Sequence, residues 1–215
     1  MEILYQDNRI VVCVKPAGVL STDEPGGMPE LLRAALGTDC IRTVHRLDAA
    51  VGGVMVFARS RMAASILSEQ VREHRLHKEY LAVAAGRLPE GGELRDFLLR
   101  DAHTGVTCAV PEGTPGAKEA RLTYRALSCT DDATLVRIVL GTGRTHQIRV
   151  QFASRGHPLR GDRKYGSGGE GLALWSCRLG LFHPQTGQWM EFARYPDKIP
   201  AFSAFPACVF EDSGV

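Results

Sequence analysis

The sequence predicts an α+β fold built on a largely antiparallel sheet. Short apolar runs bounded by glycine or proline alternate with segments whose apolar residues recur at helical spacing. Two strand-like runs are separated only by the residues TDDA, a spacing typical of a hairpin. No linker or internal repeat interrupts the 215 residues, so we expect one domain with a substantial core.

The N-terminal part begins with an expected strand and a short helix. Residues 9–18, RIVVCVKPAG, form an apolar run that ends at Pro16 and Gly18, which is typical of a strand entering a turn. Residues 28–37, MPELLRAALG, predict a helix stopped by Gly37.

A buried strand and a longer helix are expected next. Residues 54–58, VMVFA, are apolar and bounded by glycines on the N-terminal side, which predicts a buried strand. The following helix, within residues 60–74, takes Ser60 as its N-cap. Its apolar residues recur at helical spacing, namely Ala63, Leu67 and Val71.

The central part is expected to alternate between regular strands and one irregular segment. Residues 77–86, HKEYLAVAAG, have strand chemistry with two distinct faces. Residues 95–120 are rich in turn formers, so we expect an irregular excursion or flexible flap there. Residues 121–129 and 134–143 then form the two strands of the predicted hairpin.

The C-terminal part is expected to contain a helix and a closing pair of strands. Thr145 can cap a helix within THQIRVQFASRGHP, and Gly156 and Pro158 can end it. Residues 172–193 read as two strands around a turn that contains proline and glycine.

Composition and charge argue against a strongly basic, secreted, membrane-spanning or zinc-binding protein. The net charge is +2, so any polyanion site must come from local clustering. The N-terminus lacks a signal-peptide pattern, and no apolar run reaches the roughly 20 residues of a membrane span. The 6 cysteines include no CxxC pair, so we expect no zinc site and read them as reduced core residues of a cytoplasmic protein.

Asp48 is the first candidate catalytic residue. It follows His45 and Arg46 and precedes the expected buried strand. A carboxylate near cations and apolar walls can act as a nucleophile or general base in a dry site. The alternative, which the residues alone favour, is a structural ion pair between Asp48 and Arg46.

Two further stretches suggest nucleic-acid contacts. In HKEYLAV, Tyr80 could stack on a base while Lys78 meets phosphate; the alternative is a core tyrosine beside a solvated lysine. Residues 141–166 carry a local net charge of +5 with interspersed aromatics, which suits an RNA backbone. Arg144 lies in a glycine-flanked turn before a helix and could help to hold a phosphate; the alternative is a solvated helix face.

The ordered motifs HRLD, KEYLA and GRTHQIRV...GHPLRGDRKYG closely resemble those of the RluA-type pseudouridine synthases. The resemblance spans nearly the whole chain, from ILYQDNRIVVCVKPAGVLS to FARYP. It implies one catalytic domain over residues 1–215, around a mixed, mainly antiparallel sheet flanked by helices. It also implies no metal, no cofactor, and structured RNA (transfer or ribosomal) as the partner. We expect no membrane association, no obligate protein partner and no separate N-terminal RNA-binding domain.

The resemblance also assigns roles by position. Asp48 matches the catalytic aspartate, Tyr80 the tyrosine that stacks on the target uracil, and Arg149 the arginine that pairs with the aspartate. Arg46 matches the arginine that helps to displace the target nucleotide. The other motif positions expected to bind substrate are His45, Lys78, Arg144 and His146.

The chain departs from the family pattern directly after HRLD. The family usually has a polar stretch resembling R-D-T-S-G, whereas this chain has AAVGG, with Val51 and Gly52 where threonine and serine usually stand. One alternative is therefore an RNA-binding relative with impaired catalysis. The other is a glycoside hydrolase, which needs a second carboxylate, and Asp162 is the nearest candidate.

Overall fold

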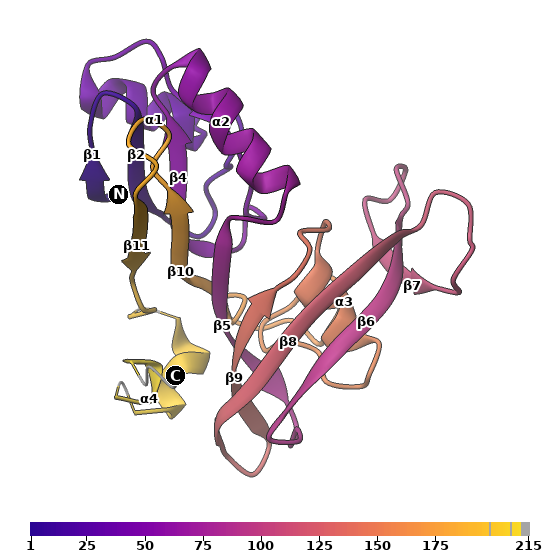
Figure 1. The fold of residues 1–215 in the computed structure, drawn as a ribbon. Helices are drawn as coiled ribbons and strands as arrows, with labels where there is room; N and C mark the ends of the chain where they lie inside the picture. The colour runs from indigo at the N-terminus through magenta and orange to yellow at the C-terminus, as the bar shows by residue number, and fades with distance from the viewer. Residues whose placement is uncertain (198, 207, 212–215) are drawn as a thin grey trace. The chain divides into compact units, whose positions relative to one another are not determined.

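The computed structural model describes residues 1–197, 199–206 and 208–211 (Figure 1). The chain divides into two compact units, which are Met1–Lys78 with Ser176–Arg194 (unit 1) and Glu79–Trp175 with Tyr195–Val215 (unit 2). The expectation of one domain stays a prediction, and its last positions, 212–215, lie outside the described residues. Within the described part, no helix is both long and apolar enough to cross a membrane.

Unit 1 is built on strands that pair around β4. The strands are β1 (Glu2–Gln6), β2 (Ile10–Lys15), β3 (Arg42–Thr43), β4 (Gly52–Ala58), most of β10 (Leu174–Phe182) and β11 (Trp189–Ala193). β1 pairs with β2, β2 and β3 pair with β4, and β10 pairs with β11, all antiparallel. Every residue of β4 is buried, as its continuous apolar sequence predicts for a central strand.

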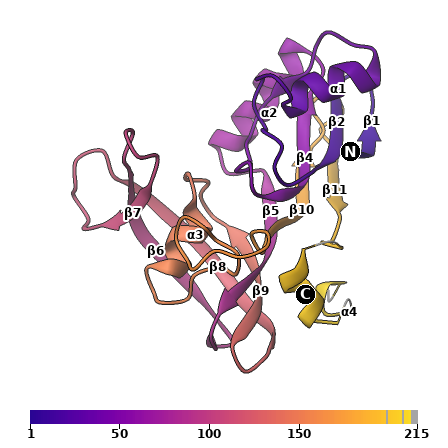
Figure 2. The ribbon, with the colours of Figure 1, turned by 180° about the vertical axis from the view of Figure 1, so that it is seen from behind.

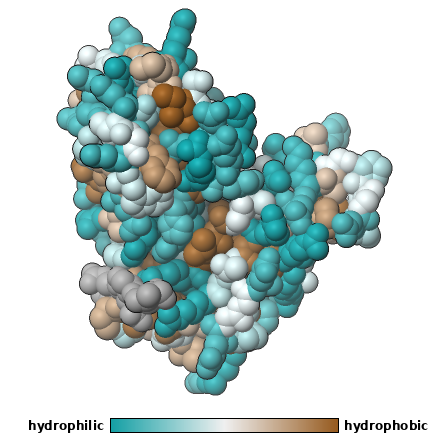
Figure 3. All heavy atoms as spheres, viewed as in Figure 1, coloured by the Kyte–Doolittle hydropathy of each residue, from teal (hydrophilic) through white to brown (hydrophobic). Residues whose placement is uncertain are grey.

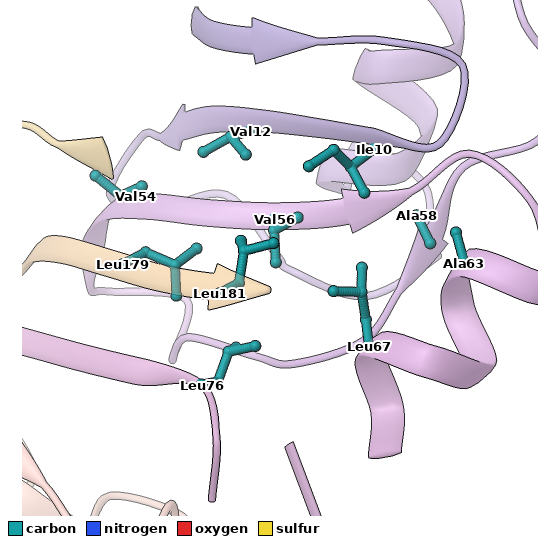
Figure 4. Close-up of a cluster of buried hydrophobic side chains, with 10 residues drawn as sticks. All are labelled: Ile10, Val12, Val54, Val56, Ala58, Ala63, Leu67, Leu76, Leu179 and Leu181. Atoms are coloured by element: carbon teal, nitrogen blue, oxygen red, sulfur yellow. The ribbon is translucent and has the colours of Figure 1, made fainter. Parts of the chain in front are cut away.

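The two helices of unit 1 begin and end where the sequence signals predict. α1 (Met28–Leu36) ends at Gly37, which adopts the left-handed conformation. α2 (Arg61–Arg72) begins after Ser60, whose side chain accepts a hydrogen bond from the Ala63 N–H. The apolar side of α2 packs on the sheet, and Figure 4 shows the resulting cluster: Ile10, Val12, Val54, Val56, Ala58, Ala63, Leu67, Leu76, Leu179 and Leu181.

Unit 2 contains a second run of antiparallel pairs. Its strands are most of β5 (His77–Ala85), then β6 (Gly91–Arg100), β7 (Thr107–Val110), β8 (Lys118–Cys129) and β9 (Ala133–Leu140). They follow the order β5-β9-β8-β6-β7, and β8 and β9 form the hairpin that TDDA predicts. In Figure 3, hydrophilic and near-neutral residues predominate along β8 on the side that faces the viewer.

The expectation of an irregular segment over residues 95–120 is wrong for half of its length, which belongs to β6, β7 and β8; the rest forms the two turns 101–106 and 111–117. Leu94 and Leu98 of β6 are buried, but the residue between them on the same face is Asp96. Asp96 accepts hydrogen bonds from Gln151 and Arg155, so its charge is satisfied inside the packed layer. This polar position breaks the apolar alternation by which the strand would have been recognised.

The helix of unit 2, α3 (Gln147–Ala153), lies on the face of β6 and β8, in front of them in Figure 2. The prediction that Thr145 caps it is wrong. His146 precedes the first turn with φ 56°, and its side chain makes no capping hydrogen bond. The Gln147 side chain instead accepts hydrogen bonds from the Arg144 N–H and the Thr142 hydroxyl, which fixes the entry to the helix.

The C-terminal segment adds a 3-10 helix η1 (Pro200–Ala204) and a short α4 (Cys208–Glu211), which the sequence patterns did not predict. The rings of Phe202 and Phe210 pack with centroids 5.9 Å apart, and Arg137 donates to the Phe210 carbonyl. The two closing strands, β10 and β11, are as predicted. The predicted α+β class with a mainly antiparallel sheet is confirmed.

The cysteines only partly follow the expectation of core positions. Cys13 and Cys177 are buried, whereas Cys108, Cys129 and Cys208 are exposed, so the core assignment is wrong for these three. The exposed ones lie on an edge strand, at a strand end and in the terminal helix, where a small side chain meets solvent. Among the described residues, no group of three or more histidine, cysteine or acidic side chains could hold a metal ion.

Candidate active site

The loop that carries Asp48 lies between β3 and β4 of unit 1, and its backbone is fixed on both sides of the carboxylate. The Ser21 hydroxyl donates to the Leu47 carbonyl at 2.7 Å and accepts from the Leu47 N–H at 3.1 Å. The Val51 N–H closes a turn onto the Asp48 carbonyl at 3.0 Å. The half-buried Asp48 therefore extends from a backbone with little freedom.

Lys15, at the end of β2, is fully buried at 0% exposure below this loop. Its ammonium donates to the carbonyls of Pro16 at 2.9 Å, Val19 at 2.6 Å and Ala49 at 3.0 Å. Burial lowers the pKa of Lys15 to about 8, while the negative charge of Asp48 acts in the opposite direction. A positive charge thus lies within electrostatic reach of the candidate carboxylate and also braces the residue that follows it.

Lys15 is not among the residues predicted from motifs, although the sequence carries a signal for it. Lys15 ends the run IVVCV, which is apolar on both faces, as is typical of a strand buried on both sides. Such a residue must find hydrogen-bond acceptors inside the protein, because burying an unpaired charge is too costly.

His45 is only 8% exposed, and its Nε2 accepts a hydrogen bond from the Val56 N–H at 3.2 Å. Burial, assisted by the positive charge of Lys78, lowers the pKa of His45 to about 3. The ring is therefore neutral at physiological pH, with its proton on Nδ1. This geometry favours a role in tying the loop to β4, whereas Arg46 lies exposed on the loop.

Of the residues that depart from the family pattern, Ala49 and Ala50 are exposed and the next three are packed. Val51 and Gly52 are buried at the start of β4. Gly53 has φ 124°, and a side chain there would overlap the backbone of Ser176. The bracing in this loop comes from Lys15 and Ser21.

In unit 2, Arg149 lies on the first turn of α3 and forms a buried ion pair with Asp162. Its Nε and Nη2 donate to the two carboxylate oxygens, each at 2.8 Å. Asp162 also accepts the backbone N–H of Lys164 at 2.9 Å and of Tyr165 at 3.1 Å. Burial acts to raise the pKa of Asp162, but these hydrogen bonds outweigh it and lower the pKa.

Asp162 was not expected as a partner of Arg149, although it is the only acidic residue in the basic stretch 141–166. The prediction that Arg149 also reaches Asp48 stays a prediction. The two-point contact with Asp162 fixes the plane of the guanidinium, so Arg149 is rigidly oriented whatever its remaining donors meet.

Tyr165 extends this network. The Arg149 guanidinium carbon lies 5.1 Å from the centre of the Tyr165 ring. The phenol oxygen lies 2.7 Å from His146 Nδ1 and accepts the Thr107 N–H at 2.9 Å. The left-handed backbone of His146 thus places its ring against Tyr165, which the sequence analysis had noted only as an interspersed aromatic.

The remaining candidates are Tyr80 and Lys78 on β5, and Arg144 in the segment between β9 and α3. Tyr80 of β5 is 5% exposed and pairs across the ladder with Ile138. Lys78 shares its strand face by alternation, and burial lowers the pKa of Lys78. Arg144 is anchored because its Nε donates to the Glu119 carbonyl at 2.8 Å.

Comparison with a solved structure defines the class of fold. The chain superimposes on human RNA pseudouridylate synthase domain containing 1 with a TM-score of 0.78 and 24% identity, over 94% of this chain and 86% of that one. At that identity, the likeness shows that this is a pseudouridine synthase fold.

The sequence comparisons are more specific. Residues 9–154 match the family model described as RNA pseudouridylate synthase. The chain is 35% identical to the dual-specificity RNA pseudouridine synthase RluA of Yersinia pestis, over 89% of this chain and 97% of that protein. It is 32% identical to the ribosomal large subunit pseudouridine synthase D of Neisseria meningitidis serogroup A, over 93% of this chain and 59% of that protein. The chain belongs to the RluA-type RNA pseudouridine synthase family, and it spans about half to two thirds of the length of several curated relatives.

Proposed function

We propose that this chain isomerises specific uridines in structured RNA, transfer or ribosomal, to pseudouridine. Membership of the family supports the reaction on RNA, and the name of the Neisseria relative supports ribosomal RNA as one class of substrate. The observation that carries the proposal is the Asp48 loop. It presents a half-buried carboxylate on a fixed backbone, with a buried ammonium in electrostatic reach.

The reaction sets clear demands on that carboxylate. The bond between C1′ and N1 of uridine breaks, a bond between C1′ and C5 forms, the proton leaves C5, and N1 gains a proton. An ionised Asp48 can attack C1′ or remove a proton from the sugar, and both routes need a carboxylate held in one orientation. In this proposal the buried residues that follow, Val51–Gly53, limit the access of water to the intermediate.

The other residues take supporting roles in the proposal. Tyr80 stacks on the uracil, and Arg149 pairs with Asp48 as well as with Asp162. Arg46 helps to hold the target nucleotide out of its stack, a displacement that costs a few kcal/mol. Phosphate contacts from substrate-binding residues offset that cost, and these residues are Lys78, Arg144 and His146. His45 acts through the loop that it ties to β4.

The two rival readings make different demands. A hydrolase needs a second carboxylate that can carry a proton, but both oxygens of Asp162 accept hydrogen bonds and its pKa is lowered. An impaired relative would bind RNA without turnover. The proposal invokes no metal or cofactor.

The test is to map pseudouridine across cellular RNA with and without this protein. Loss of one or a few sites is expected when the protein is removed. The mapped target should then react as a minimal stem–loop and fail as a perfect duplex or as free uridine, since unpaired bases are cheapest to displace. An unchanged map contradicts the proposed function, and release of free uracil would favour the hydrolase.

A further inference from the structure

The turn between β6 and β7 of unit 2 is a compact structure with its own internal hydrogen bonds. One oxygen of the Asp101 carboxylate accepts the N–H of His103 at 2.7 Å and of Thr104 at 3.2 Å. The Gly105 N–H donates to the Asp101 carbonyl at 2.9 Å. Residues 101–104 are exposed, so this turn presents a defined shape to solvent.

Two contacts hold the turn against the segment that contains Asp162. The Lys164 ammonium donates to the Gly105 carbonyl at 3.1 Å, and the Thr107 N–H donates to the Tyr165 hydroxyl. Asp162 accepts the backbone N–H groups of both Lys164 and Tyr165, and it is fixed by Arg149. The turn is therefore positioned by the same buried ion pair that orients Arg149.

Two cations flank an open space at Gly105. A side-chain carbon built on Gly105 would lie 3.8 Å from Arg100 Nη2 and 3.8 Å from Lys164 Nζ, with no other atom within 4 Å. Gly105 has φ 65° and leaves that space empty. Both cations are exposed, and among the described residues no carboxylate forms an ion pair with either of them.

We propose that Arg100, Lys164 and the space over Gly105 form a site for one phosphate of the RNA backbone, which we call the Gly105 phosphate site. The identity of the ligand rests on the proposed function. A guanidinium can give two parallel hydrogen bonds to the non-bridging phosphate oxygens, and the ammonium supplies a point charge. An anion between the two cations also removes the repulsion between them.

The test adds a carboxylate to this space without removing either cation. Aspartate tolerates the left-handed conformation better than most residues, so Gly105→Asp strains the backbone at φ 65° less than most substitutions do. Its carboxylate would pair with Arg100 and Lys164 and occupy the phosphate position. Gly113→Asp is the matched control, because Gly113 has φ 85°, lies in the next turn of unit 2, and has nothing within 4 Å of its side-chain position.

The measurement is the affinity for a labelled short oligouridylate at a series of potassium chloride concentrations, with circular dichroism to check folding. Gly105→Asp should weaken binding and reduce the logarithmic salt slope by about 0.7, the value for one phosphate contact on single-stranded RNA. Gly113→Asp should match the wild type in slope. Arg100→Gln and Lys164→Gln should each reproduce part of the loss, which keeps the test decisive should Gly105→Asp fail to fold.

An unchanged slope in Gly105→Asp, or equal losses in Gly105→Asp and Gly113→Asp, would overturn the site, because the effect would then be absent or due to bulk charge. The binding assay requires no turnover. A protein that binds as predicted and forms no pseudouridine would therefore leave the Gly105 phosphate site standing while contradicting the proposed function.

Discussion

The stability of this protein is expected to fall in mild acid because of His45. The ring is buried and neutral, its Nε2 accepts the Val56 N–H, and its pKa is lowered from 6.5 to about 3. In the unfolded chain the same histidine takes up a proton near its ordinary pKa. Because the folded-state pKa is the lower one, the stabilisation is complete above pH 6.5 and is lost as the pH falls toward 3.

The magnitude follows from the shift. Each pH unit inside that window costs about 1.4 kcal/mol, so lowering the pH from 6.5 to 5 should remove about 2 kcal/mol of the free energy of unfolding. Other groups titrate as well, so the comparison needs a matched variant. His45→Gln keeps an acceptor within reach of the Val56 N–H and has no titratable group.

The assay is urea unfolding of the wild type and His45→Gln at pH 7 and pH 5. The wild type should lose about 2 kcal/mol more than the variant between these two values. Equal losses in the two proteins would refute the assignment of a buried, neutral His45.

Four further predictions concern Arg149, Asp162, Tyr80 and Gly53. Arg149→Lys should lose most activity in a turnover assay, because lysine cannot reproduce the two-point contact with Asp162. Asp162→Asn should lower the free energy of unfolding by about 3–5 kcal/mol, because the buried charge of Arg149 is then left without its partner. Tyr80→Phe should keep substrate affinity better than Tyr80→Ala, measured as KM, since only the alanine variant loses the ring; equal KM values would contradict stacking. Gly53→Ala should fail to accumulate as folded protein in an expression test, because its side chain would overlap Ser176; a stable variant would contradict this backbone geometry.

Much of the fold could be predicted because local signals were strong. Ser60 and Gly37 are favourable cap residues, and the helices beside them begin and end accordingly. The strand β6 was not recognised because Asp96 faces inward, where it accepts hydrogen bonds from Gln151 of α3 and from Arg155, which follows that helix. No local pattern reveals a partner that is 55–59 residues away in the chain.

The same limit applies to the candidate site. Asp48 and Arg149 were found because they lie in recognisable motifs. Lys15 and Asp162 support them through contacts that span 34 and 13 residues, and spacing alone encodes neither contact. The cap at His146 was missed because its left-handed backbone is held by Tyr165, a tertiary contact, rather than by the usual side-chain capping of a threonine.

The central claim is that the Asp48 carboxylate performs the isomerisation. The most direct measurement uses RNA that contains the mapped target and carries tritium at C5 of its uracils, because forming the bond between C1′ and C5 releases that hydrogen to solvent. The wild type should release tritium from the target uridine, while Asp48→Asn, folded and with unchanged RNA affinity, should release none. Tritium release by a well-folded Asp48→Asn protein would contradict the account.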